Sequence, residues 1–180
     1  IPEGWYMVYD GNKLSGSAGS GARMRTFSEG GDFTRGFYTR TNNDTPDMCI
    51  VEYGSVEGYE LTLEAGKKYK ISYNLLSWKG ATYARFEIYN PNGEIVHTQV
   101  DECKGTAGGN INIVITGSNF VEYTFVPEES GNYRVRWTPS NGNGDLTGGM
   151  NEIVFANPKV TYFPNAAGVV ETQNLLKSLN

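Results

Sequence analysis

Hydrophobic and polar residues alternate with a period of two along much of the chain. Residues 59–75 read YELTLEAGKKYKISYNL, two alternating segments around a glycine turn. Residues 120–138 read FVEYTFVPEESGNYRVRWT and repeat this arrangement, with Tyr133 at the place of Tyr69. Alternation broken by glycine turns is typical of antiparallel strands that bury one face and expose the other. The pattern therefore indicates an all-β domain and points away from folds built on βαβ units.

Further short strands are predicted wherever alternating β-branched and aromatic residues lie between turn-forming residues. The predicted strands cover residues 5–9, 23–27, 36–40, 48–53, 59–64, 69–78, 83–89, 94–100, 111–115, 120–126, 132–138, 151–155 and 158–163. No segment within residues 1–163 has helical periodicity. Short strands in this number predict two stacked antiparallel sheets, and they favour a jelly roll over a seven-stranded immunoglobulin-type sandwich.

The last part of the chain, NAAGVVETQNLLKSLN, has a different character because it contains no aromatic residue. Its apolar residues near helical spacing are Val170, Leu175, Leu176 and Leu179. We predict a short helical linker that starts a further module, with a helix capping the sandwich as the alternative. The expected boundaries are residues 1–163 for the β-sandwich and residues 164–180 for the linker.

Composition agrees with a single β-rich domain. A chain of 180 residues fits one domain with a sizeable core, and 23 Gly, 12 Tyr, 8 Phe and 3 Trp suit many turns and aromatic strands. A hydrophobic fraction of 38% is too high for a disordered chain. No apolar run long enough to span a membrane and no signal peptide is seen. The opening, IPEGW, favours a cut made just before a domain.

The charge of the chain limits the kinds of partner it can bind, and its two cysteines leave the disulfide state open. The formal net charge is -5, and the 15 basic residues form no run of five, so a nucleic acid partner is excluded. A mildly acidic surface is typical of an exported protein. Cys49 and Cys103 are too far apart for a C-x-x-C motif. One disulfide between them and two free thiols both remain open.

The alternation also predicts which residues face the core and which face outward. The predicted core residues are Trp5, Tyr69, Ile71, Tyr73, Leu75, Ala84, Phe86, Ile88, Tyr133, Val135 and Trp137. The predicted outward-facing residues are Asn74, Tyr83, Arg85, Glu87, Arg134 and Arg136. If their three strands share one sheet, they form a polar strip with an aromatic edge.

Such a strip could bind a sugar, because flat C–H faces stack on aromatic rings and planar polar side chains bond to hydroxyls. Trp78, which follows a predicted strand and precedes Lys79-Gly80, is the best single candidate at its rim. The predicted ligand-binding residues are Trp78, Tyr83, Asn74, Arg85, Glu87 and Arg136. The alternative for the strip is an ordinary solvated face with Arg–Glu pairs. The alternative for Trp78 is a side chain folded over the edge of the core.

The charges on this strip would indicate the kind of glycan. Unpaired arginines at positions 85, 134 and 136 would favour an acidic glycan. Pairing of these arginines with Glu87 and Glu122 would remove that indication.

Catalysis finds little support in the sequence. His97 is the one histidine, and it lies in an alternating segment where a surface or hydrogen-bonded polar residue is expected. Glu128 and Glu129 are adjacent in a turn and are interpreted as solvated. A β-sandwich hydrolase would need two carboxylates facing each other across a groove, so we predict no enzyme activity.

Several segments together are similar to a known family. PEGWYMVYDG, LTLEAGKKYKISYNLLSW, ARFEIYNPNGEIV, FVPEESGNYRVRW and EIVFANPKVTYF resemble a jelly-roll carbohydrate-binding module. This is the galactose-binding-like sandwich found beside glycoside hydrolases and in surface proteins of gut Bacteroidetes. The resemblance covers about residues 1–163, and NLLKSL resembles the helical connectors between such modules.

The resemblance implies a non-catalytic module of a larger exported multidomain protein, outside the cell or at its surface. Its implied partners are a polysaccharide and other domains of the same chain. Similar sandwiches also act as structural or adhesion spacers, so a spacer without a sugar ligand is the alternative.

The resemblance further implies a structural calcium ion near the chain ends, although no cofactor is required. Its candidate ligands in this chain are Glu3, Asp10 and Asn157. The family often has Asp-Asp or Asp-Asn before the last apolar strand. This chain departs from that pattern with Ala156-Asn157-Pro158, and it has no D-x-D-x-D segment.

Overall fold

A computed structural model describes eight stretches of the chain, and they form thirteen β-strands. The stretches are residues 1–8, 21–29, 35–41, 49–77, 82–108, 113–146, 151–163 and 173–179. The strands are β1 (Trp5–Met7), β2 (Gly21–Glu29), β3 (Arg35–Thr41), β4 (Val51–Tyr53), β5 (Leu61–Leu63), β6 (Tyr69–Ser77), β7 (Tyr83–Tyr89), β8 (Ile95–Glu102), β9 (Thr106–Gly108), β10 (Ile113–Thr116), β11 (Asn119–Phe125), β12 (Gly131–Ser140) and β13 (Asn151–Tyr162). Within these stretches there is no α-helix, and so none that could cross a membrane.

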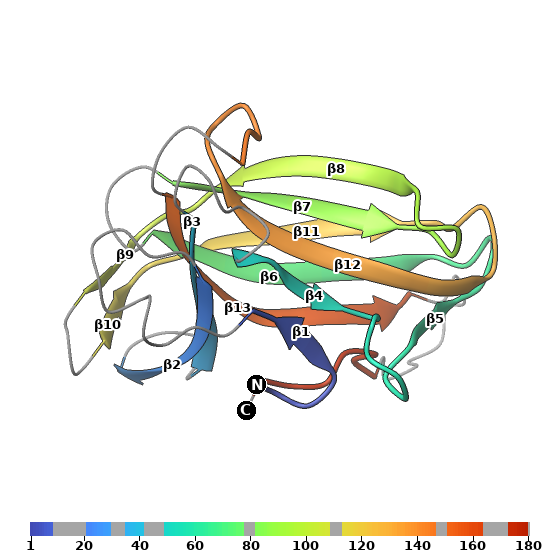
Figure 1. The fold of residues 1–180 in the computed structure, drawn as a ribbon, viewed down its shortest axis with the longest axis horizontal. Helices are drawn as coiled ribbons and strands as arrows, with labels where there is room; N and C mark the ends of the chain where they lie inside the picture. The colour runs from blue at the N-terminus through green and yellow to red at the C-terminus, as the bar shows by residue number, and fades with distance from the viewer. Residues whose placement is uncertain are drawn as a thin grey trace.

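The strands form two stacked sheets. The first sheet has six strands in the order β1-β4-β12-β7-β8, with β5 also beside β12. The second has seven strands in the order β11-β6-β13-β3-β2-β10-β9. Figure 1 shows the first sheet in front of the second, with β12 and β7 crossing over β11 and β6. The pairings are antiparallel except for the parallel contact of β10 with β2. The prediction of an all-β, two-sheet sandwich is confirmed.

The two matching sequence passages are paired with each other. In each passage the turn carries the chain from one sheet to the other: from β5 to β6 in the first, and from β11 to β12 in the second. Antiparallel pairs then join β6 to β11 and β5 to β12. The Ala65 amide donates to Ser130 Oγ over 2.8 Å, and the Gly66 amide donates to the Pro127 carbonyl over 2.9 Å. The two turns therefore lie side by side (Figure 1).

The core lies between the sheets and is centred on aromatic rings. All the residues assigned to it from strand alternation are buried, which confirms that assignment. The Trp137 ring lies 4.4 Å from Phe155, 5.1 Å from Phe86 and 5.4 Å from Tyr73, measured between centroids. Trp137 and Phe86 belong to the first sheet, and the other two rings belong to the second. These contacts join the two sheets, and aromatic pairs at such distances add to the stabilisation from burial.

Two local features of the strands differ from the prediction. No strand is predicted between residues 100 and 111, yet this part of the chain contains β9, which pairs with β10. The strands predicted at 151–155 and 158–163 are one strand, β13, with a bulge at Asn157 and Pro158 where its register with β6 shifts. Asn157 has a φ of 53°, a left-handed conformation that asparagine tolerates better than most residues.

The bulge leaves room for the last described segment of the chain. β3 pairs with β13 only as far as Ala156, so the same edge of β13 is unpaired beyond the bulge. Asn174 fills this place: its Oδ1 accepts from the Val160 amide over 3.0 Å, and its Nδ2 donates to the Pro158 carbonyl over 3.3 Å. The Leu175 amide then donates to the Val160 carbonyl over 2.7 Å.

The predicted helical linker is therefore wrong for residues 173–179, while residues 164–172 lie outside the described part of the chain. Leu176 and Leu179 are buried in the core, and Trp5 Nε1 donates to the Lys177 carbonyl over 3.0 Å. Burial of two leucines stabilises this segment more than a lone short helix would gain in water. The N-terminal segment and the last described residues thus lie together near β1 (Figure 1).

We expect Asn174→Ala to lower the free energy of unfolding by about 2 kcal/mol, because it leaves backbone groups of β13 without their partners. Urea unfolding of the domain would measure this loss. Asn132→Ala is the matched control: Asn132 is exposed and makes one side-chain bond, with Thr62, so about 0.5 kcal/mol is expected there. Equal losses in both variants would contradict the role given to Asn174.

Candidate functional site

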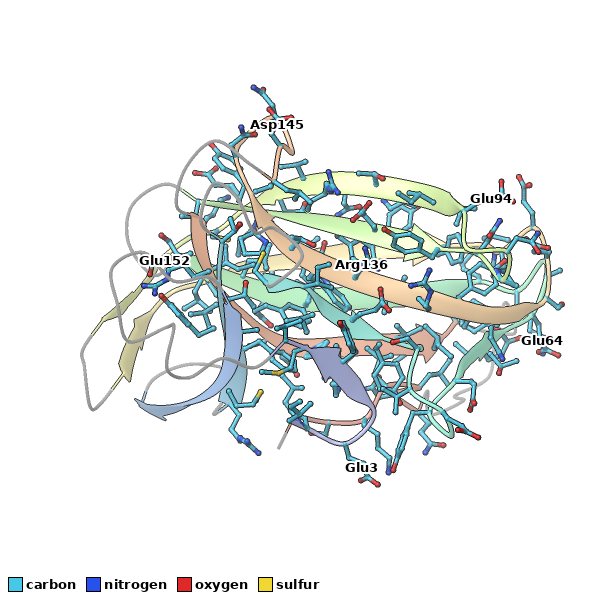
Figure 2. All side chains as sticks on the ribbon, viewed as in Figure 1. Glu3, Glu64, Glu94, Arg136, Asp145 and Glu152 are labelled. Atoms are coloured by element: carbon cyan, nitrogen blue, oxygen red, sulfur yellow. The ribbon has the colours of Figure 1, made fainter. Side chains whose placement is uncertain are left out.

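The outer face of the first sheet holds most of the predicted ligand-binding strip. Tyr83, Arg85 and Glu87 lie on β7, and Arg136 lies directly opposite Glu87 on the neighbouring β12. Figure 2 shows Arg136 near the middle of this face. Asn74 does not join the strip, because its strand, β6, belongs to the second sheet. The condition that all three strands share one sheet is therefore met by β7 and β12 and not by β6.

A buried carboxylate that the sequence analysis did not single out organises this face. Glu52 on β4 is 3% exposed, and it lies opposite Arg136. Arg136 Nε donates to Glu52 Oε2 over 2.7 Å, and Arg134 Nη1 lies 3.2 Å from both carboxylate oxygens. Both guanidinium groups stack over the Tyr89 ring, at 4.5 Å for Arg134 and 4.6 Å for Arg136. One carboxylate thus pairs with two arginines, and one ring supports both of them.

The remaining arginine of the strip is also paired. Arg85 Nε lies 3.4 Å from Glu87 Oε1, and Arg85 Nη1 donates to the Gly144 carbonyl over 3.1 Å. Glu122 instead lies 3.6 Å from Lys70 Nζ on the second sheet. The indication of an acidic glycan therefore disappears, with Glu52 and Glu87 as the partners.

The pKa shifts agree with a fixed network. Burial acts to lower the pKa of Arg136, but its hydrogen bond to Glu52 and the nearby negative charge outweigh burial and raise it. Burial raises the pKa of Tyr89 as well. Arg136 therefore stays charged and Tyr89 stays neutral over the usual pH range, and each arginine of the strip keeps a carboxylate partner.

The other predicted site residues have separate surroundings. Asn74 is buried; its Nδ2 donates to Ser118 Oγ over 3.1 Å, and its Oδ1 accepts from Asn157 over 3.4 Å. Tyr83 is half-buried and packs beside Gly142 of the loop after β12. Trp78 and Asp10 lie outside the described residues.

The calcium prediction remains a prediction. Glu3 accepts a hydrogen bond from the Tyr59 hydroxyl, whereas Asn157 contacts Asn74. The described part of the chain contains no group of three or more His, Cys, Asp or Glu side chains suited to a metal ion. The third expected ligand, Asp10, belongs to the residues that are not described.

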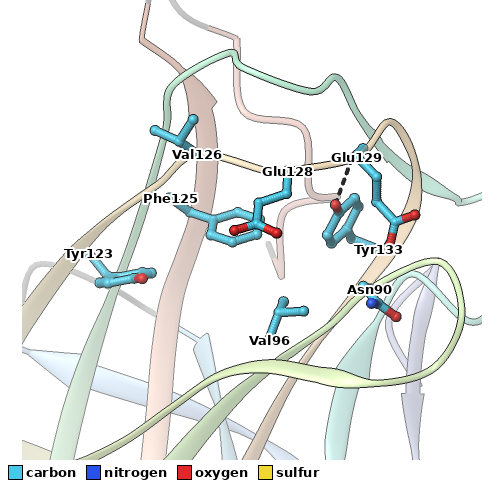
Figure 3. A pocket seen from close by; sticks show the side chains of 8 residues that line it. All are labelled: Asn90, Val96, Tyr123, Phe125, Val126, Glu128, Glu129 and Tyr133. Atoms are coloured by element: carbon cyan, nitrogen blue, oxygen red, sulfur yellow. Dashed lines mark hydrogen bonds between the residues drawn. The ribbon is translucent and has the colours of Figure 1, made fainter.

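A groove of about 580 Å³ opens between the edges of the two sheets. β8 is the edge strand of the first sheet and β11 is the edge strand of the second. The lining residues come from β8, β11, β12 and the turns beside them. They are Asn90, Val96, Tyr123, Phe125, Val126, Glu128, Glu129 and Tyr133 (Figure 3).

The aromatic floor and the turn above it are held by internal contacts. Phe125 and Tyr133 meet edge to face, with ring centroids 5.6 Å apart. The Tyr133 hydroxyl donates to the Glu129 carbonyl over 2.6 Å and so fastens the turn between β11 and β12. Burial raises the pKa of Tyr133, which keeps the phenol protonated as the donor. The Glu128 side chain points from this turn into the groove (Figure 3).

A stacked pair brings the sheet edges together beside the groove. The rings of His97 on β8 and Tyr123 on β11 are 3.9 Å apart and nearly parallel, at 11°. His97 Nε2 also bonds to Gln99 Oε1 over 2.7 Å, as expected for a hydrogen-bonded polar residue on a strand. One face of Tyr123 is thus covered by His97, and the same residue lines the groove.

The sequence analysis missed this groove. Glu128 and Glu129 are exposed, as predicted for a turn, yet they line a concave surface. The available signal was the match between the two passages, which places β11 beside β6. Nothing in the sequence placed β8 and Val96 opposite β11.

Comparisons with known proteins support the fold. No family model and no curated protein matches the sequence. An exo-β-agarase structure is similar over 91% of this chain and 24% of its own, with a TM-score of 0.56 and 8% identity. A CBM4 structure has a TM-score of 0.47 and 14% identity, covering 88% of this chain and 85% of its own. The K1 adhesin domain of Lys-gingipain from Porphyromonas gingivalis has a TM-score of 0.46 and 11% identity, covering 92% and 94%.

These matches have different coverage. The chain spans about a quarter of the agarase chain, and most of the CBM4 and adhesin domains. The likeness to the agarase structure shows a shared β-sandwich fold.

Proposed function

We propose that this chain is a non-catalytic, jelly-roll carbohydrate-binding module of an exported multidomain protein, and that it binds a sugar chain in the groove between β8 and β11. The observation that carries the proposal is the combination of a half-buried aromatic ring, Tyr123, with hydrogen-bonding side chains in one concave site. A volume of about 580 Å³ lies within the usual range for small-ligand pockets.

The groove offers both kinds of contact that a sugar needs. The half-buried Tyr123 and the half-exposed Val96 and Val126 present apolar surface to C–H groups. The Glu128 and Glu129 carboxylates are acceptors for sugar hydroxyls. Asn90 Oδ1 already accepts from the Asn92 and Glu94 amides, and this turns its Nδ2 toward the groove (Figure 3).

Binding without catalysis fits the placement of the acids. Glu128 and Glu129 are neighbours on one turn, whereas glycoside hydrolysis uses two carboxyl groups on opposite sides of the scissile bond. The alternative function is a spacer or adhesion domain without a sugar ligand. On the outer face of the first sheet, all three arginines are engaged by carboxylates of the same chain, which favours that alternative for that face.

We expect Tyr123→Ala to weaken polysaccharide binding about tenfold or more, because it removes the stacking face of the groove. Affinity gels containing a range of polysaccharides would measure this, with thermal melting as the test of folding. Tyr83→Ala is the matched control on the outer strip, and no change in binding is expected there.

Because Tyr123 also stacks on His97, Glu128→Ala serves as a second groove variant that removes an exposed side chain. Loss of binding in Tyr83→Ala alone would move the site to the outer strip. A wild-type domain that binds no polysaccharide would favour the spacer function.

A further inference from the structure

The groove between β8 and β11 has an unbalanced charge. Its lining contains two carboxylates, from Glu128 and Glu129, and no Lys, Arg or His. Neither carboxylate has an ion-pair partner among the described residues. Arg134, the arginine next to Tyr133 in the sequence, is paired with Glu52 on the outer face of the sheet instead. Negative charge in the groove is therefore left for a ligand to compensate.

The half-buried Tyr123 ring adds a second, independent preference for positive charge, whereas Phe125 and Tyr133 are buried behind the lining. Ring faces attract cations, and ammonium groups bind well where a ring and a carboxylate converge. The Glu128 carboxylate lies in the middle of the groove, between Tyr123 on one side and Tyr133 on the other (Figure 3). Phe125 also lines the groove and is itself buried. A compact cation on a sugar ring would meet both kinds of group in this place.

We propose that the groove selects an amino sugar with a free ammonium group, that is, a chain containing deacetylated hexosamine units. This inference rests on the proposed sugar-binding function of the same groove. The ammonium group would bind to the Glu128 carboxylate, with Glu129 adding to the field, while the sugar C–H groups pack on Tyr123. An N-acetylated sugar lacks the charge, and a uronic acid is repelled by the two carboxylates.

Calorimetric titration of the whole chain with oligosaccharides of equal length tests this selection. The four ligands are oligomers of glucosamine, which carries the ammonium group, of N-acetylglucosamine, of glucose linked as in cellulose, and of the anionic galacturonate. The glucosamine oligomer is expected to bind about tenfold more tightly than the N-acetylated one, as for a partly exposed charge pair with a cation–π contact. Raising the salt concentration should reduce this difference.

The matched variants separate charge from shape. Glu128→Gln should abolish most of the preference for glucosamine, and Glu129→Gln should reduce it. Glu57→Gln makes the same charge change at an exposed position outside the groove, and it should leave the preference unchanged.

The possible results distinguish a failure of the amino-sugar selection from a failure of the sugar-binding function. Equal binding of neutral and glucosamine oligomers, lost in Tyr123→Ala, would overturn the amino-sugar selection and leave the sugar-binding function standing. A preference that survives Glu128→Gln would also overturn it. Equally tight binding of a lysine oligomer would show that the sugar ring contributes nothing, and would overturn it too. Binding of no oligosaccharide would overturn both the selection and the function.

Discussion

Trp137→Ala should lower the free energy of unfolding by about 4 kcal/mol, the largest effect of a single substitution proposed for this domain. Trp137 is fully buried, and its ring touches rings from both sheets, including Tyr73 and Phe155 of the second. Removal of the indole leaves a large cavity where the sheets meet, and the surrounding rings can fill it only in part. Equilibrium unfolding in urea, followed by far-ultraviolet circular dichroism, measures the loss.

Two further variants test the cause of that loss. Trp137→Phe keeps a ring between the sheets and should cost less than half as much as the alanine variant. Phe120→Ala removes an aromatic side chain that is 57% exposed, so a change of about 0.5 kcal/mol or less is expected. If Phe120→Ala were as damaging as Trp137→Ala, burial between the sheets would not be the source of stability.

Glu52→Gln should lower the free energy of unfolding by about 3 kcal/mol, because it removes the negative charge that two arginines share. Arg134 and Arg136 would then face each other over the Tyr89 ring without a carboxylate between them. Their partial exposure to solvent keeps the loss below that of a fully buried pair.

Glu122→Gln is the matched control for Glu52. Glu122 pairs with Lys70 at 3.6 Å on the solvent-exposed face of the second sheet, where about 0.5 kcal/mol or less is expected. Urea unfolding at neutral pH measures both variants. Equal losses would show that Glu52 behaves as an ordinary surface carboxylate despite its burial.

Strand alternation predicted the sandwich well because it reports which side chains are buried. Tyr69, Tyr73 and Leu75 on one strand, and Phe86 and Ile88 on another, follow the period of two and all lie in the core. The two turns of the matching passages were also predicted from their glycines. In these cases the information is local, so one stretch of sequence contains it.

Pairing between distant strands could not be predicted in the same way. Only the strand order β4-β12-β7 brings Arg134, Arg136 and Tyr89 to Glu52. The groove depends likewise on β8 lying opposite β11 across the sandwich edge. These contacts join residues far apart in the chain, and a single sequence does not record which strands become neighbours.

Residues 173–179 show that apolar spacing can predict burial correctly and still predict the wrong backbone conformation. Leu176 and Leu179 are spaced as in a helix, and both are indeed buried. The surface that buries them, however, is the core of the same domain, where the bulge in β13 and the side chain of Asn174 hold the segment in a non-helical conformation. Spacing indicated that these residues need burial, and the tertiary contacts decided the backbone conformation.

The return of residues 173–179 to the side of β1 has a mechanical consequence. Tension applied through the two ends would act on the short contact between residues 173–179 and β1. In this contact Trp5 Nε1 donates to the Lys177 carbonyl, and Leu176 and Leu179 are buried in the core. The force would break this contact before it separated the long strand pairs of either sheet. Under force the domain would first lengthen by releasing its tail, while the aromatic centre around Trp137 stayed intact.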